Sequence, residues 1–245
     1  MKTLLTGLLT LMIGLSFSSN AHALLRVITI GDSITSGLKL NASKTDWYCP
    51  ADGVRTSSFY ACRGNNALNR GGYQPHTRNL FAQNGINADL YNWGINGAES
   101  WQLNGVATQA MNARPADVVF IMAGVNDLND NVSAHTTAFS IELIMDTVRA
   151  RGLKVVVGTV TPHAGVSSYN AKIAQINGLI KTAAAARKIP VADHFSTFIT
   201  NWNAYHSGDG LHINNTGDAV MASKWVAAYD EISVVISPVL RLLLD

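Results

Sequence analysis

Four short segments of the sequence hold the residue types that nucleophilic catalysis uses. They are Gly-Asp-Ser-Ile-Thr-Ser-Gly at 31–37, Asn-Trp-Gly-Ile-Asn-Gly at 92–97, Gly-Val-Asn-Asp at 124–127 and Asp-Gly-Leu-His at 209–212. A serine hydroxyl is a weak nucleophile until a base removes its proton, the base needs an acid to orient it, and the oxyanion that forms needs fixed hydrogen-bond donors. Together the four segments contain candidates for all of these parts.

The first and last segments predict the nucleophile and its base. Ser33 follows an apolar run and has glycine nearby, which allows a tight turn that presents the hydroxyl. Asp209 and His212 are three residues apart, so on one turn the carboxylate can accept from Nδ1 while Nε2 faces Ser33. We expect the oxyanion donors to be the backbone N–H groups of Ser33 and Gly94 and the side-chain amide of Asn126.

Each segment alone also fits an ordinary structural role, because Asp-Ser pairs, glycine-rich turns and Asn-Asp turns often cap helices or close loops. We expect Asp32 to stabilise the serine turn or a helix N-terminus, and Asp127 to belong to a turn or to support the site from outside. His163 and His194 also follow apolar runs, but neither has an acid at the three-residue spacing. We interpret His163 as a residue at the rim of the site and His194 as structural.

These segments need a scaffold that brings them together. Apolar runs typical of strands lie at 25–30, 88–91, 118–122, 154–158 and 190–193. Helical patterns lie at 74–84, 101–111, 133–150, 169–187 and 215–229. The alternation predicts right-handed βαβ crossovers and a five-stranded parallel sheet between two layers of helices. Functional residues in such sheets gather at the carboxyl ends of the strands, where the first three segments lie.

The four segments resemble the sequence blocks of the SGNH or GDSL hydrolases (esterases and lipases), which are built around a Ser, a Gly, an Asn and a His. The matching residues are Ser33, Gly94, Asn126 and His212. The resemblance covers residues 25–225 and implies a flavodoxin-like three-layer α/β/α sandwich, with Asp209 as the acid of the triad. It departs at Ile213, where the family often has Pro. Gly71-Gly72-Tyr73 and the segments at 117–120 and 209–212 also resemble the acetylxylan-esterase branch.

Composition narrows the class of protein. The chain has 245 residues, 47% hydrophobic and 14% charged, which suits a single globular domain. A net charge of +2 is far below that of a dedicated nucleic-acid binder. The sequence has no cysteine pair at metal-ligand spacing and no Gly-rich phosphate loop, which argues against a structural zinc site, an NTPase or a dinucleotide enzyme. We therefore expect an enzyme with no metal and no organic cofactor, acting as a monomer.

The first 23 residues have the features of a secretory signal peptide. Lys2 is followed by an apolar run at 4–17 and by the small-x-small pattern Ala21-His22-Ala23. The run is too short to span a bilayer, so we expect cleavage near Ala23, a secreted or periplasmic protein, and no integral membrane segment in the mature chain. A single hydrolase domain is then expected over 24–245.

Cys49 and Cys62 are the only cysteines, and in an exported protein two cysteines most simply form a disulfide. The loop at 46–63 that they close is rich in aromatic residues. Such a loop suits a wall of the substrate site and a cover over ordinary core equally well.

The substrate is predicted only as a class: a small-molecule, lipid or carbohydrate ester, with short acyl chains or acetyl groups on carbohydrate favoured. Trp93, Trp101 and His163 are candidate substrate-lining residues, although large aromatics more often belong to the core. One alternative is a lysophospholipase or lipase-like hydrolase, for which the apolar tail at 232–244 would suit a lipid surface, although a closing segment packed on the domain explains that tail better. Another is a non-catalytic carbohydrate-binding relative.

Overall fold

The computed structural model describes residues 23–37, 55–56, 59–60, 72–164 and 167–234. Both cysteines of the expected disulfide, Cys49 and Cys62, and residues 1–22 of the expected signal peptide lie outside the described residues. Within the 46–63 loop, β2 (Arg55–Thr56) and β3 (Phe59–Tyr60) pair as a short antiparallel ribbon.

The five predicted strands form one parallel sheet in the order β4-β1-β5-β6-β7. Their bounds are β1 (Leu25–Gly31), β4 (Ala88–Gly94), β5 (Val118–Met122), β6 (Lys154–Gly158) and β7 (Val191–Ala192). Every residue of β5 is buried, as expected of a central strand covered on both faces. The register pairs Gly31 of β1 with Gly94 of β4 on one side and with Met122 of β5 on the other. Three of the functional segments therefore leave the sheet side by side.

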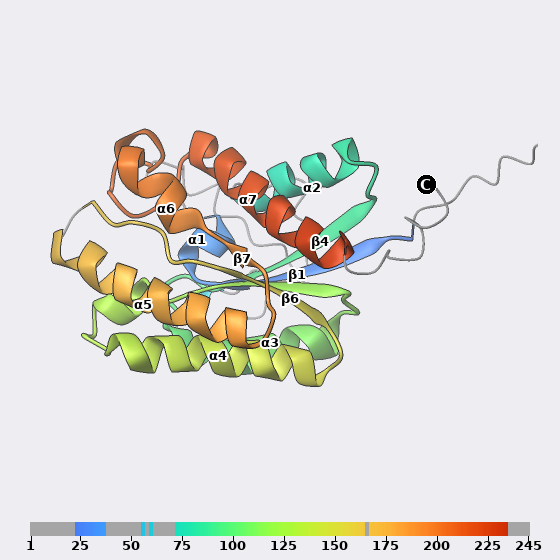
Figure 1. The fold of residues 1–245 in the computed structure, drawn as a ribbon, viewed down its shortest axis with the longest axis horizontal. Coiled ribbons are helices and arrows are strands. Elements are labelled where there is room, and N and C mark those ends of the chain that lie inside the picture. Colours follow the sequence, from blue (N-terminus) through green and yellow to red (C-terminus); the bar gives the residue numbers. More distant parts are fainter. Residues whose placement is uncertain (1–22, 38–54, 57–58, 61–71, 165–166, 235–245) are drawn as a thin grey trace, which may run out of the picture.

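Helices cover both faces of the sheet and confirm the three-layer sandwich (Figure 1). One layer contains α3 (Leu103–Ala113), α4 (Ala134–Ala150) and α5 (Ser167–Ala186). The other contains α2 (Tyr73–Gln83), α6 (His194–Phe198) and α7 (Asn215–Val234). Among the described residues, no helix has the length and apolar character needed to cross a membrane.

Trp225 joins α7 to the sheet and to the neighbouring helix. Its ring is fully buried, stacks on Phe120 of β5 at a centroid distance of 4.8 Å, and lies 5.6 Å from the ring of Tyr73 in α2. A Cβ at Gly158 of β6 would lie 2.8 Å from this indole, so a side chain there would push α7 away from the sheet. This packing fixes the helix that follows the Asp209–His212 segment.

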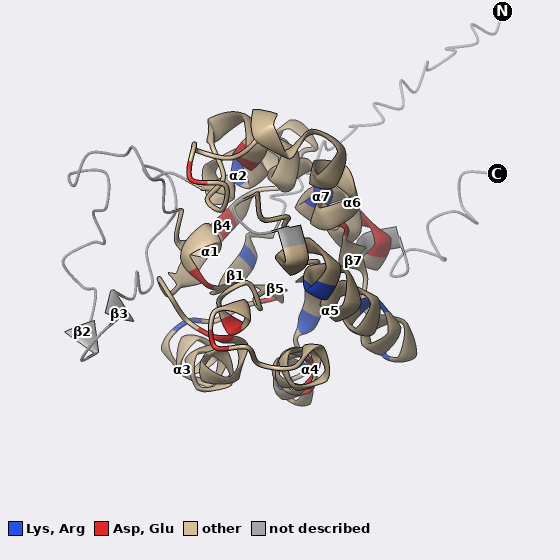
Figure 2. Ribbon diagram, turned by 90° about the vertical axis from the view of Figure 1, so that its left-hand side faces the viewer, with Lys and Arg blue, Asp and Glu red and all other residues tan. Residues whose placement is uncertain are grey.

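Residues 194–204 form short helices that the sequence analysis did not assign. They are α6 and a 3₁₀ segment, η4 (Ile199–Ala204). His194, Phe198 and Trp202 follow one another at four-residue intervals and are all buried, so a helical period was present but short. Figure 2, which looks onto the carboxyl edge of the sheet, shows α1 (Ser33–Ser36) in front of the strands with the two helix layers on either side.

Candidate active site

Ser33 is the first residue of the short helix α1, directly after β1. The Asp32 carboxylate caps this helix by accepting the N–H of Ile34 at 2.9 Å, and Gly37 closes it in a left-handed conformation with φ 84°. The turn is buried, including Asp32 and Ser33. It therefore presents the serine hydroxyl from a fixed backbone.

Two glycines allow α1 to sit this close to the sheet. A Cβ at Gly31 would lie 2.1 Å from Thr35 Oγ1 and 2.4 Å from the carbonyl oxygen of Met122. A Cβ at Gly94 would lie 2.2 Å from the backbone nitrogen of Ser36. These separations are impossible for real atoms, so the glycines of the first two segments are required by close backbone approach.

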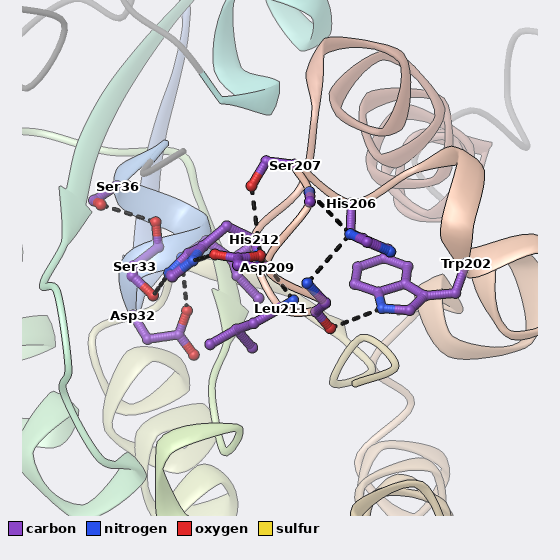
Figure 3. Close-up of polar contacts among 12 residues, drawn as sticks. Asp32, Ser33, Ser36, Trp202, His206, Ser207, Asp209, Leu211 and His212 are labelled. Carbon is purple, nitrogen blue, oxygen red and sulfur yellow. Dashed lines mark hydrogen bonds and ion pairs between the residues drawn. The ribbon is translucent and has the colours of Figure 1, made fainter. Parts of the chain in front are cut away.

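Ser33, His212 and Asp209 form a continuous hydrogen-bonded chain (Figure 3). Nε2 of His212 lies 2.9 Å from Ser33 Oγ, and Nδ1 of His212 lies 2.5 Å from Asp209 Oδ2. The other carboxylate oxygen of Asp209 accepts the backbone N–H groups of Leu211 at 2.9 Å and His212 at 2.8 Å. The carboxylate therefore assigns the proton to Nδ1 and leaves the Nε2 lone pair facing the serine.

The electrostatics of Asp209 suit this arrangement. Burial opposes ionisation of the carboxyl group, but the hydrogen bonds from the His212 side chain and from two backbone N–H groups outweigh it. The pKa of Asp209 consequently lies below its usual range. Asp209 remains an acceptor at neutral pH and can stabilise positive charge on His212.

The structure also gives the positions of the expected oxyanion donors. The N–H of Gly94 donates to Asn92 Oδ1 at 2.9 Å, so this hydrogen reaches a substrate oxygen only if the two acceptors share it. Asn126 donates from Nδ2 to the carbonyl of Ala98 at 2.9 Å, which uses one of its two amide hydrogens and leaves the second for another acceptor. Of the two, the Asn126 side chain has the greater donor capacity.

Asp127 joins the segments that follow β4 and β5. It is fully buried, and its carboxylate accepts both the backbone N–H of Ser100 at 2.9 Å and the Ser100 hydroxyl at 2.5 Å. This is the supporting role expected from the sequence. Through Ser100 it fixes the 3₁₀ turn η2 (Ser100–Gln102), which carries Trp101.

His163 and His194, the two other histidines that follow predicted strands, differ in burial. Partial burial lowers the pKa of His163, and its electrostatic neighbours include Asp209 and His212, so it lies close to both residues. His194 is fully buried against Trp225, with ring centroids 4.8 Å apart, and belongs to the core.

The two tryptophans predicted to line the substrate site differ in solvent exposure. Trp93 is 3% exposed and packs in the hydrophobic core, so it presents no surface to a substrate. Its assignment as a lining residue was wrong, because Trp93 lies in the buried carboxyl end of β4 and packs into the core. Trp101 is 62% exposed on η2 and remains available for contact.

Sequence reasoning missed the residues that support the loop of Asp209 and His212. Trp202 Nε1 donates to the carbonyl of Gly210 at 2.9 Å, and Nδ1 of His206 accepts two backbone N–H groups from the same loop. Their only sequence signal is the four-residue spacing of the two aromatic rings, which pack 5.7 Å apart. Among the residues that the structure describes, no group of three or more His, Cys, Asp or Glu is placed to hold a metal ion.

The solved structures similar to this chain include esterases and lipases. An acetyl xylan esterase from Geobacillus stearothermophilus matches with a TM-score of 0.64 and 16% identity, over 83% of this chain and 94% of the other. A lipase/acylhydrolase from Enterococcus faecalis matches with a TM-score of 0.61 and 18% identity, over 83% and 94%. A member of the lipolytic G-D-S-L family from Veillonella parvula matches with a TM-score of 0.60 and 18% identity, over 83% and 97%. At these identities the likeness establishes the fold.

The sequence itself establishes the family. Comparison with curated proteins gave no match. The model of the GDSL-like lipase/acylhydrolase family matches residues 29–220, which include all four segments. The chain therefore belongs to the GDSL-like lipase/acylhydrolase family and is a carboxylic ester hydrolase.

Proposed function

We propose that this protein hydrolyses esters through an acyl-enzyme formed on Ser33, with His212 as base and Asp209 as its orienting acid. The observation that carries the proposal is the pair of contacts at His212: Nε2 at 2.9 Å from Ser33 Oγ and Nδ1 at 2.5 Å from Asp209. Both lie within the reach that proton transfer requires.

In the first half of the reaction His212 removes the Ser33 proton while Oγ attacks the ester carbonyl. The tetrahedral oxyanion is stabilised by the backbone N–H of Ser33 and the free amide hydrogen of Asn126, with the shared N–H of Gly94 as the third donor. The imidazolium then gives its proton to the leaving alcohol oxygen, and the C–O bond breaks.

In the second half a water molecule takes the place of the alcohol. His212 removes its proton, the resulting hydroxide attacks the acyl-serine, and collapse of the second tetrahedral intermediate releases the acid and restores the Ser33 hydroxyl. Asp209 stays ionised throughout and stabilises the charged imidazole, in keeping with its lowered pKa.

For the substrate we propose short acyl chains, with acetyl groups on carbohydrate first. Two observations favour this class: the similar solved structures include an acetyl xylan esterase, and Trp101 offers an exposed indole of the kind that stacks on sugar rings. Lysophospholipase or lipase-like action is the second candidate, since similar structures also include a lipase/acylhydrolase. A non-catalytic carbohydrate-binding relative is the third and is disfavoured by the assembled Ser33–His212 contact.

The test is hydrolysis of p-nitrophenyl acetate by the wild-type protein and by Ser33→Ala. We expect activity that the variant abolishes, and wild-type activity equal to that of Ser33→Ala would overturn the mechanism. A series of p-nitrophenyl esters from acetate to palmitate, run beside acetylated xylan and a lysophospholipid, then assigns the substrate. The highest kcat/KM on a long chain would favour the lipase-like alternative.

We further propose that the protein is exported after cleavage near Ala23, carries a Cys49–Cys62 disulfide, and works as a monomer without a cofactor. One measurement examines the first two points, namely the intact mass of the exported protein under non-reducing conditions. The expected mass lacks residues 1–23 and two cysteine hydrogens. A mass that includes those residues, or that gains two hydrogens, contradicts the corresponding point.

A further inference from the structure

The loop that carries Asp209 and His212 is closed at its base. His206 and Ile213 form an isolated antiparallel bridge, the N–H of Ser207 donates to the carbonyl of His212 at 2.6 Å, and the N–H of Asn214 donates to the carbonyl of Tyr205 at 2.8 Å. These bonds fix where the loop begins and ends. They do not fix the tip, where Asp209 lies.

The tip has unusual backbone freedom. Asp209 stands between Gly208, with φ 103°, and Gly210, with φ 76°, and both values lie in the left-handed range that glycine adopts readily. A carboxylate flanked by two glycines has little intrinsic preference for one orientation. The N–H groups of Leu211 and His212 hold the Asp209 carboxylate on its C-terminal side, but the peptide N–H groups of Gly208 and Gly210 need a separate acceptor.

The His206 ring makes this connection. Its Nδ1 atom accepts the N–H of Gly208 at 3.0 Å and the N–H of Gly210 at 3.2 Å, so a single atom holds the backbone on both sides of Asp209 (Figure 3). An atom that accepts two N–H groups carries no proton, so the ring proton is on Nε2, which lies 3.3 Å from Asn203 Oδ1.

Two further contacts hold the ring and the peptide it binds. The ring packs against Trp202 at a centroid distance of 5.7 Å, and the indole N–H of Trp202 donates to the carbonyl of Gly210 at 2.9 Å. The same carbonyl accepts the N–H of Ala164, in the segment after β6, at 2.8 Å. Gly210 is thus held through both its N–H and its carbonyl group. We call the contacts of His206 and Trp202 with Gly208 and Gly210 the clamp, and Trp202 belongs to η4.

We infer that His206, through the acceptor at Nδ1, is a positioning residue that sets the orientation of Asp209 and thereby of the His212 imidazole. The inference rests on the proposed function for the roles of Asp209 and His212. The side-chain hydrogen bonds of His206 run to the loop backbone and to Asn203, so the side chain acts through the loop. Misplacing a catalytic group by about 1 Å costs up to roughly 10²-fold in rate.

A pair of variants of equal shape isolates the acceptor. In asparagine, Oδ1 is bonded to Cγ as Nδ1 is in histidine, so His206→Asn retains an acceptor at the critical position, whereas His206→Leu has the same branched shape with no acceptor. On p-nitrophenyl acetate we expect His206→Leu to lose about 10- to 100-fold in kcat with KM changed less than about two-fold. We expect His206→Asn to recover kcat to within about three-fold of wild type. Equal kcat values for the two variants would overturn the inference.

A second readout does not depend on turnover. We expect the proton shared by His212 Nδ1 and Asp209 to give a low-field proton NMR signal, which Asp209→Ala identifies by removing it. The signal should persist in wild type and His206→Asn and shift or broaden in His206→Leu, and an unchanged signal in the leucine variant contradicts the inference. If wild type itself lacks Ser33-dependent activity, the proposed function fails while this signal still tests the clamp. If His206→Leu fails to fold, His206→Gln replaces it. The acceptor of glutamine lies one bond further out than Nδ1, so the same loss of kcat and the same change of the NMR signal are expected.

Discussion

Ser33 and His212 are separated by 179 positions in the sequence, and their side chains meet at 2.9 Å because both lie at the carboxyl edge of one parallel sheet. The serine comes from the turn that ends β1. The histidine comes from a loop held between η4 and α7. The geometry of the site therefore depends on elements from opposite ends of the chain.

Replacing Asp209 by Asn tests the orienting acid. Asn retains an oxygen for the backbone N–H groups of Leu211 and His212, but its amide hydrogens face Nδ1 and favour the wrong tautomer of His212. We expect kcat to fall by about 10³- to 10⁴-fold with the fold unchanged. Steady-state kinetics with circular dichroism as control measures this, and a loss under ten-fold would remove Asp209 from the triad.

Replacing Asn126 by Ala tests the strongest candidate for the oxyanion hole. Loss of one fixed donor is expected to lower kcat by roughly 10²- to 10³-fold. Loss of the bond to the Ala98 carbonyl should cost only about 1 kcal/mol of stability. The two effects separate when kcat and the free energy of unfolding are measured on the same samples. An unchanged kcat would exclude Asn126 from the hole.

The scaffold was predictable because its signals are local. β5 is a continuous apolar run that is buried throughout, and α4 buries Ile141, Met145 and Val148, whose spacing of four and three residues is typical of one helix face. The four functional segments were predictable for the same reason, because each lies next to a strand or helix whose own residues indicate it. For that reason the predicted strands and helices agree with the observed ones to within a few residues.

Features that depend on register or on irregular backbone were not predictable. Asn92 Oδ1 accepts the N–H of Gly94 only because of the way β4 ends. His206 Nδ1 accepts the N–H groups of Gly208 and Gly210 only because both glycines are left-handed. Neither leaves a periodic pattern in the sequence. Trp93 was misassigned because its position beside the second segment does not show that both faces of the sheet are covered at the carboxyl end of β4.

Asp32 is predicted to make stability fall as pH rises. Burial raises the pKa of Asp32 to about 7, the bond from Ile34 opposes the shift, and the Asp127 carboxylate adds to it. Between about pH 4 and pH 7 the folded protein therefore holds a proton that the unfolded chain has lost, and the contribution of Asp32 to stability decreases with pH through this window. Asp32→Asn retains the cap and removes the titration, so it should gain on the order of a few kcal/mol relative to wild type at pH 8.

The control for this measurement is Asp32→Ala. It also removes the titration but loses the cap to Ile34, which should cost about 1 kcal/mol at every pH relative to Asp32→Asn. Urea unfolding at pH 5, 6, 7 and 8 gives the slope for each protein. If wild type and Asp32→Asn show the same slope, the carboxyl is not protonated in the folded state.

His194 is predicted to have the opposite effect, destabilising the fold in acid. Its ring is fully buried beside Phe198 and Trp225, and burial lowers its pKa from 6.5 to about 3, with Lys224 lowering it further and Asp193 opposing. A histidine whose folded pKa is depressed binds its proton first in the unfolded chain. The contribution of His194 to stability should therefore decline as pH falls from about 6.5 towards 3, by up to a few kcal/mol in total.

His194→Leu fills a similar volume without a titrating group and should flatten this acid decline. The matched control is His135→Leu, since His135 is exposed on α4 and its replacement should leave the slope as in wild type. Unfolding free energies measured between pH 4 and pH 7 compare the three proteins directly. Asp32 and His194 change stability in opposite directions over overlapping pH ranges, so in wild type their effects partly cancel. In Asp32→Asn only the His194 effect remains, and stability should fall more steeply towards acid pH. In His194→Leu only the Asp32 effect remains, and stability should fall as pH rises towards 7. A double variant that retains either slope would show that another buried group dominates.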